Sequence, residues 1–158
     1  MIGERTPYPD PNARGVFFGL TLRHEKSHLI RAVMEGVAFS LRDSLEIMKS
    51  LGIPIRQVRA SGGGGRSNLW RQIQADVFGQ EVVTTNIDEG PAFGAALLAG
   101  VGSGCYPSVR EACERTIRVT SRTSPDPRLV RLYEEYYHLY HSLYPLLRER
   151  FEKIAALR

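Results

Sequence analysis

The stretch SGGGGRSNLWRQIQADVFG, from Ser61 to Gly79, sets the architecture of this chain. Four consecutive glycines separate a short apolar segment, residues 55–61, from a segment in which Leu69, Ile73 and Val77 recur at helical spacing. Glycine loses more backbone freedom on folding than any other residue, so four at one junction need a reason. A helix N-terminus attracts anions, and glycines there let a phosphate or a flat base approach the backbone. The junction therefore predicts a ligand site, and the alternative is a flexible turn without chemical importance.

This junction nearly matches one known phosphate-binding motif, the P-loop. The P-loop pattern GxxxxGK[ST] fails because Ala60 occupies the position of the first glycine and Arg66 that of the lysine. The dinucleotide pattern GxGxxG fails as well. The prediction therefore rests on the strand-to-helix geometry alone, with Ser67 or Asn68 as the helix cap or as a polar contact to the ligand.

Strands and helices are expected to alternate around the glycines. Short apolar or β-branched runs predict strands, and apolar residues at spacings of three and four predict helices. Such an order favours an α/β domain with some parallel strand pairing. The predicted strands are residues 16–22, 55–61 and 81–85, and the predicted helices are residues 27–51, 68–78 and 90–100 with a short helix after Ser108.

The C-terminal part is expected to form a linker and one long helix. Residues 120–128 have the composition of a linker, and Asp126 followed by Pro127 is typical of a helix start. Leu and aromatic residues then recur at helical spacing, and Pro145 is expected to kink the helix because it cannot bond back to His141. The tyrosines of this helix are interpreted as a packing face rather than a ligand site.

Composition limits the choice of partners and compartment. The chain has 158 residues, 42% of them hydrophobic, which is enough for a core. The net charge of +4 comes from scattered arginines, so neither nucleic acid nor a membrane is expected as a partner. No apolar run fits a membrane span or a signal peptide. Cys105 and Cys113 form no metal motif, and two free thiols fit a reducing cytoplasm.

Residues 24–28, HEKSH, match the zinc-protease pattern HExxH. That chemistry needs both histidines on one helix, one turn apart, so that both reach the metal. Ser27 is expected to be the N-cap, which would leave His24 and Glu25 before the helix, and no metal site is predicted. His138 and His141 are interpreted as surface or packing residues because no acidic partner is evident.

The segment GVFFGLTLRHEKSHLIRAVMEGVAF, residues 15–39, is similar to the second signature of the FGGY family of carbohydrate kinases. The resemblance to this family covers nearly the whole chain. The segments GERTP (residues 3–7), SGGGGRSN (61–68) and EGPAFGAALLAG (89–100) follow in the order expected of the family. The tail LYPLLRERF, residues 143–151, resembles the xylulokinases within it.

The resemblance implies a fold, a reaction and a ligand. It implies the second domain of a ribonuclease-H-like kinase of the actin and hexokinase type, incomplete at its N-terminus and ending in a long helix. The whole enzyme would transfer the γ-phosphate of ATP to a sugar hydroxyl, with Mg2+ held through the phosphates. D-xylulose is the expected sugar, and ribulose, fuculose, gluconate or glycerol are alternatives. The ATP-binding residues implied by position are Gly62, Gly63, Gly64, Ser67 and Asn68.

The sequence also departs from the family. The resemblance implies that a first domain, with the catalytic aspartate and most of the sugar site, lies outside this sequence. Neither Asp76, in a predicted helix, nor Asp88, in a predicted turn, is assigned that role, so no catalytic residue is predicted. Residues 1–120 are expected to form the nucleotide-binding domain, and residues 121–158 the linker and a helix packed on it. We expect this chain alone to be inactive; a non-catalytic nucleotide-binding or interaction fragment is the alternative.

The same incompleteness predicts self-association. A sheet that lacks strands exposes backbone N–H and C=O groups that can pair with another chain. A homodimer is one assembly that would satisfy them.

Overall fold

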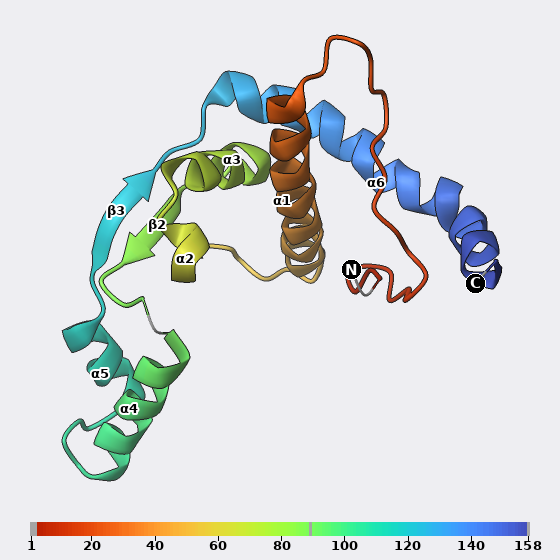
Figure 1. The fold of residues 1–158 in the computed structure, drawn as a ribbon. Coiled ribbons are helices and arrows are strands. Elements are labelled where there is room, and N and C mark those ends of the chain that lie inside the picture. The colour runs from red at the N-terminus through yellow and green to blue at the C-terminus, as the bar shows by residue number, and fades with distance from the viewer. Residues whose placement is uncertain (1–2, 89, 158) are drawn as a thin grey trace. The chain divides into compact units, whose positions relative to one another are not determined.

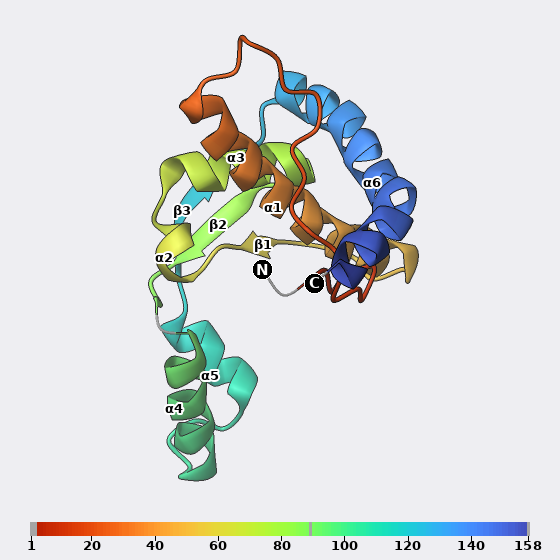
Figure 2. The same ribbon diagram turned by 45° about the vertical axis from the view of Figure 1, so that its right-hand side comes forward.

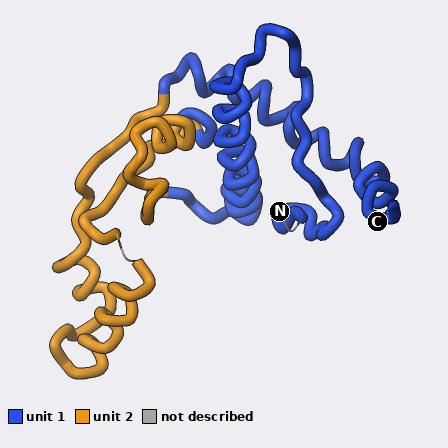
Figure 3. The backbone as a smooth tube through the Cα atoms, viewed as in Figure 1, with its two compact units in different colours: residues 1–55, 76–78, 126–158 blue, residues 56–75, 79–125 orange. Residues whose placement is uncertain are grey.

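The computed structural model describes residues 3–88 and 90–157, and the chain divides into two compact units (Figures 1 and 3). Unit 1 comprises residues 1–55, 76–78 and 126–158, and unit 2 comprises residues 56–75 and 79–125. Each unit has its own core.

Unit 2 is built on a three-stranded sheet of order β1-β2-β3 (Figure 2). Strand β1 (Val58–Arg59) pairs in parallel with β2 (Val82–Thr85), which pairs antiparallel with β3 (Val119–Thr123). A parallel pair needs a crossover, which here contains the glycine turn α2 (Gly62–Gly65) and helix α3 (Asn68–Phe78). The α/β class and the parallel pairing are thus confirmed.

The core of unit 2 is formed by side chains from β2 and the first part of α3. Val82 and Val83 are fully buried, and Ile73 is 1% exposed. Helices α4 (Gly90–Gly102) and α5 (Val109–Thr116) pack against each other in the same unit.

Several helix ends form where their capping residues predict them. Ser108 Oγ accepts from the backbone N–H of Glu111, 3.2 Å away. Gly79 adopts the left-handed conformation, φ 59°, that glycine tolerates at the end of a helix. Asp126 caps the last helix, α6 (Pro127–Ala156), which continues through Pro145. These ends are fixed by local side-chain and backbone bonds, so the sequence alone could locate them.

Unit 1 is held together by α6 and helix α1 (Lys26–Ser50). Buried Phe39 packs against the rings of Tyr133, Tyr137 and Tyr140, with ring centroids 6.0, 6.1 and 5.4 Å away. Tilted and edge-to-face contacts of this kind suit the charge distribution of aromatic rings. Tyr133 and Tyr140 therefore belong to a packing face, as predicted, but Tyr136 of the predicted face is 52% exposed and Tyr137 packs in its place.

A buried polar network joins the same two helices. Arg42 donates to the carbonyl oxygen of Val77 (3.1 Å) and to Glu134, and its guanidinium lies 4.1 Å from the centre of the Tyr137 ring. The Tyr137 hydroxyl donates to Asp43 Oδ1 at 2.6 Å. Burial raises the pKa of the Asp43 carboxyl, and the hydrogen bond from Tyr137 opposes that rise. The network thus satisfies charges that would be costly to bury unpaired.

The predicted strand at residues 16–22 is wrong. This segment has no regular structure, and its apolar side chains are exposed, with Phe18 at 75% and Leu22 fully open. A buried strand needs a partner strand and a covering layer, and none of the described residues supplies either for this segment. The strand predicted at residues 55–61 is confirmed only at its centre, where β1 has two residues.

The predicted linker at residues 120–128 is also partly wrong, since it contains most of β3. Because most of its side chains are polar, this segment lacks the alternation of apolar and polar residues that predicts a strand. The strand forms because its backbone pairs with β2 and because Thr84 Oγ1 bonds to Thr120 Oγ1 (3.0 Å) and Ser121 Oγ (2.7 Å). Cross-strand pairing between segments far apart in sequence therefore outweighs the linker-like local composition.

The two long helices carry charged side chains along their length. In the part of the chain that the structure describes, no helix has the length and apolar character needed to cross a membrane. One face of α1 nevertheless exposes four apolar side chains at helical spacing, each between 45% and 54% accessible: Ile30, Val33, Val37 and Leu41.

Replacing Tyr137 by Phe should destabilise unit 1 by about 1–3 kcal/mol, because the buried Asp43 carboxylate loses its hydroxyl donor while the ring remains. Without that donor the pKa of Asp43 rises further. The loss of unfolding free energy should therefore be largest near pH 7. It should shrink as the pH falls through the raised pKa of Asp43, since a protonated carboxyl is less costly to bury without a donor. Urea unfolding at a series of pH values from about 7 down to about 4 measures this. Tyr136→Phe, at an exposed position of α6, is the control; a loss that stays constant across the series would contradict the prediction.

The exposed face of α1 should make the chain self-associate, because contiguous apolar surface favours contact with other chains. Sedimentation velocity should show a concentration-dependent rise in mass that Val37→Glu reduces. Val109→Glu, which adds the same charge at a valine 45% exposed on α5, should leave the association unchanged. A monomer at all concentrations, or equal effects of both substitutions, would contradict this expectation.

Candidate functional site

The glycine turn lies directly after β1 and before α3. Gly62 has φ +70°, a conformation that residues with side chains rarely adopt, so a substitution there would strain the backbone. The four glycines form a single helical turn at this junction. Ser67 caps α3 by accepting from the backbone N–H of Trp70, at 3.3 Å.

The four glycines have different surroundings. A Cβ atom at Gly62 or Gly63 would meet nothing within 4 Å, so the backbone there is open. At Gly65 a Cβ would lie 3.1 Å from the carbonyl oxygen of Ala60, and at Gly64 it would lie 3.1 Å from the ring of Trp70. Packing therefore restricts the last two positions, while the first two leave the backbone accessible to a ligand.

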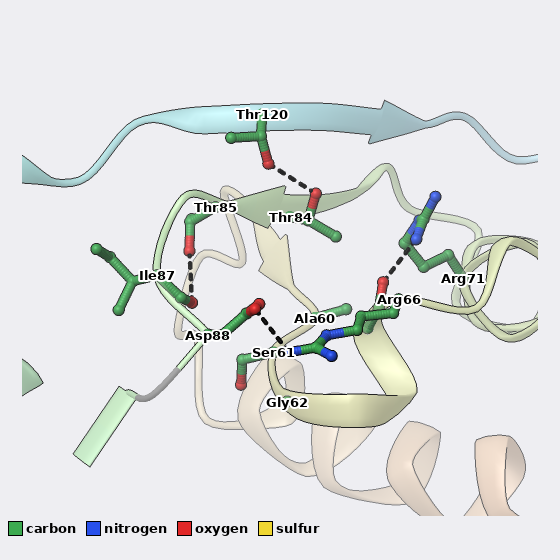
Figure 4. Close-up of a pocket in the computed structure, with 11 residues that line it drawn as sticks. Ala60, Ser61, Gly62, Arg66, Arg71, Thr84, Thr85, Ile87, Asp88 and Thr120 are labelled. Carbon is green, nitrogen blue, oxygen red and sulfur yellow. Dashed lines mark hydrogen bonds and ion pairs between the residues drawn. The ribbon is translucent and has the colours of Figure 1, made fainter. Parts of the chain in front are cut away.

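A pocket of about 170 Å3 lies between the glycine turn and the end of β2 (Figure 4). Because β1 and β2 run in parallel, with Val58 beside Val82, their carboxyl ends meet at one edge of the sheet. Ligands of α/β proteins bind at such edges. The residues that line the pocket are Ala60, Ser61, Gly62, Gly65, Arg66, Arg71, Thr84, Thr85, Ile87, Asp88 and Thr120.

Of the five residues predicted to bind the ligand, Gly62 lines this pocket. Gly63 is its neighbour and is open. Gly64 lies against Trp70, Ser67 caps α3, and Asn68 accepts a hydrogen bond from Arg71.

Sequence reasoning missed the contribution of β2, β3 and the two arginines to this pocket. The carboxyl-end rule for parallel strands could have identified Thr84 and Thr85, since they end the strand that follows the crossover. Nothing in the local sequence indicated Thr120, which reaches the pocket only through the pairing of β3 with β2.

Arg71 fixes the shape of the pocket wall. Its guanidinium donates to the carbonyl oxygen of Gly65 at 2.6 Å, to Asn68 Oδ1 and to Thr123 Oγ1 at 3.4 Å. These bonds connect the end of the glycine turn, the start of α3 and strand β3. Arg71 is therefore a structural cation, held by partners from three elements.

Arg66 and Asp88 form an ion pair on opposite sides of the pocket, as the dashed line in Figure 4 marks. The Nη2 atom of Arg66 lies 2.8 Å from Asp88 Oδ2, and the two side chains are 72% and 59% exposed. The pair connects the turn that follows α2 with the link between β2 and α4. It gives the pocket one cationic and one anionic side.

The HEKSH segment does not have the geometry of a zinc-protease helix. His24 and Glu25 lie before α1, as predicted, but the N-cap is Glu25 rather than Ser27. The carboxylate of Glu25 accepts from the backbone of His28, and His28 Nδ1 accepts from the backbone N–H of Glu25 at 3.1 Å. This reciprocal pair fixes the helix start two residues earlier than a cap at Ser27 would. Across residues 3–88 and 90–157, no three His, Cys, Asp or Glu side chains gather as a metal site would require.

The interpretation of His138 needs one correction. Its ring is exposed, but its Nε2 atom lies 3.3 Å from Glu134 Oε1, one helical turn earlier. An acidic partner is therefore present, at the i, i+4 spacing that brings side chains of one helix together.

Comparison with known proteins extends these observations. The model of the FGGY family of carbohydrate kinases, C-terminal domain, matches residues 1–103. A xylulose kinase of Bacillus subtilis is 38% identical over 91% of this chain, and a gluconokinase of the same species is 35% identical over 98%. The crystal structure of a xylulose kinase from Rhodospirillum rubrum superposes with a TM-score of 0.80 at 34% identity, over 90% of this chain.

The match covers only part of each relative. This chain spans 29% of the Bacillus xylulose kinase, 30% of the gluconokinase and 29% of the Rhodospirillum chain. The family model covers well over half of the 158 residues, including the glycine turn and both pocket-lining ends of β1 and β2. The chain therefore belongs to the FGGY family of carbohydrate kinases and carries sequence of their C-terminal domain.

Proposed function

We propose that this chain is the ATP-binding part of a sugar kinase that transfers the γ-phosphate of ATP to a sugar hydroxyl. The observation that carries the proposal is the pocket at the carboxyl ends of β1 and β2, bordered by an open glycine backbone, in a member of a carbohydrate kinase family. ATP approaches Gly62, Gly63 and Gly64 with its α-phosphate or ribose, and Ser67 and Asn68 lie near its adenine. We further propose that the nucleotide-binding domain extends to residue 120.

The pocket size supports only a partial nucleotide site in this chain. At about 170 Å3 it is smaller than the roughly 300–1,000 Å3 of complete small-molecule sites. The chain also spans less than a third of its relatives. We therefore propose that further surfaces of the kinase complete the cleft around ATP, and that Mg2+ is held mainly through the phosphates, as this ion usually is in kinases.

No residue of this chain is proposed as the catalytic base. Asp76 is 1% exposed and accepts from the backbone N–H of Asp126 at 2.8 Å, so it has a structural role. Asp88 is paired with Arg66. A general base must reach the proton that it removes, so we propose that the base lies outside this chain.

D-xylulose is the proposed sugar, which would give xylulose 5-phosphate. Support comes from the xylulose kinases among the relatives, at 34–40% identity for those of Bacillus subtilis, Escherichia coli and Rhodospirillum rubrum. A gluconokinase is 35% identical, so gluconate is the next candidate. We also propose a cytoplasmic location, with which the free thiols of Cys105 and Cys113 agree.

ATP added to the 15N-labelled chain should shift the amide signals of Ser61–Arg66 and of Thr84–Asp88. Because only part of the cleft is present, we expect a dissociation constant in the millimolar range. Gly63→Val should weaken binding about tenfold or more, since its branched side chain would fill the open space over the turn. The chain alone should not hydrolyse ATP in the presence of D-xylulose.

Gly102→Val, at an open position in α4, is the matched control and should leave ATP binding unchanged. Shifts centred on other elements, or sugar-dependent ATP turnover by this chain alone, would contradict the proposal.

A further inference from the structure

The Arg66–Asp88 pair stands apart from the other polar contacts of the pocket. Arg66 follows the glycine turn immediately, and Asp88 lies in the link between β2 and α4, 22 residues later. Both line the pocket together with Gly62, over which there is open space. The pair therefore crosses the region that a ligand on the glycine turn would occupy.

The two arginines of the pocket differ in how firmly they are held. Arg71 donates to three partners from three elements. Within the described residues, the guanidinium of Arg66 bonds to Asp88 alone, and both side chains are well exposed. Exposed ion pairs of this kind are weak, because water and salt screen them. Arg66 is thus a cation that the fold positions near the glycine turn without fixing it there.

We propose that Arg66 exchanges Asp88 for a phosphate group of the bound nucleotide, and that Asp88 competes with that phosphate for Arg66. This inference rests on the proposed ATP site. A phosphate is the better partner, because it accepts two parallel N–H bonds from a guanidinium and carries more negative charge than a carboxylate. The pair would make the site selective for phosphorylated ligands over the bare nucleoside.

The exchange predicts opposite effects at the two positions. Arg66→Gln removes the cation and should weaken ATP and ADP binding about tenfold, the size of one charge-assisted contact. Asp88→Asn removes the competing anion and should tighten ATP and ADP binding about two- to fivefold, the size of an exposed ion pair. Adenosine, which has no phosphate, should bind equally to all three proteins.

The test is an amide-shift titration of the full 158-residue chain with ATP, ADP and adenosine, for the wild type, Arg66→Gln and Asp88→Asn. The pair Arg110–Glu114 provides the controls, because it is another exposed ion pair in unit 2, with side chains 88% and 67% exposed. Arg110→Gln and Glu114→Gln change the net charge in the same way and should not alter ATP affinity. Unchanged amide signals on α5 and β3 in the Arg66 and Asp88 variants show that the fold is kept.

The outcomes separate this inference from the proposed function. If the wild type binds ATP at the glycine turn and Arg66→Gln binds it equally well, the inference is wrong and the proposed site stands. If both substitutions tighten ATP binding, the pair only obstructs the pocket, and the exchange is also wrong. If the wild type shows no ATP-dependent shifts at the turn, the proposed site fails and the inference fails with it.

Discussion

The parallel pairing of β1 with β2 is the constraint on which the candidate site depends. It brings the end of β1, from which the glycine turn starts, beside the end of β2, from which the link with Asp88 starts. The two strands are short, so few ladder hydrogen bonds hold them. Burial of Val82 and Val83, each fully removed from water, stabilises the pair by about 1.5–3 kcal/mol per side chain.

Arg71 connects the glycine turn to the strands of the sheet. Glycines give the turn no side chains with which to pack, so something else must hold it in place. The guanidinium does so by binding the carbonyl oxygen of Gly65 while contacting Asn68 and Thr123. The open backbone at Gly62 and Gly63 is thus supported from its far end and remains accessible. A rigid support beneath an accessible backbone is what a ligand site requires, since it limits the ordering cost of binding.

In unit 1, charged side chains are buried between helices α1 and α6. Arg42 and Asp43 are 7% and 5% exposed, yet each has partners on α6. Hydrogen bonds and the Tyr137 ring compensate the loss of water around these groups. Next to this network, Phe39 of α1 packs against the ring of Tyr133 on α6. Both aromatic packing and polar bonds therefore hold α1 against α6.

Features that depend on neighbours within one or two helical turns can be predicted from the sequence. It located the end of α3 at Gly79, the start of α6 at Asp126 and the glycine turn, because caps and backbone freedom are local properties. Its long signature also identified the family. The pairing of β3 with β2 and the contact between Arg66 and Asp88, in contrast, arise only in the folded chain. Those contacts join segments 22 or more residues apart, and their register depends on the whole sheet rather than on any local pattern.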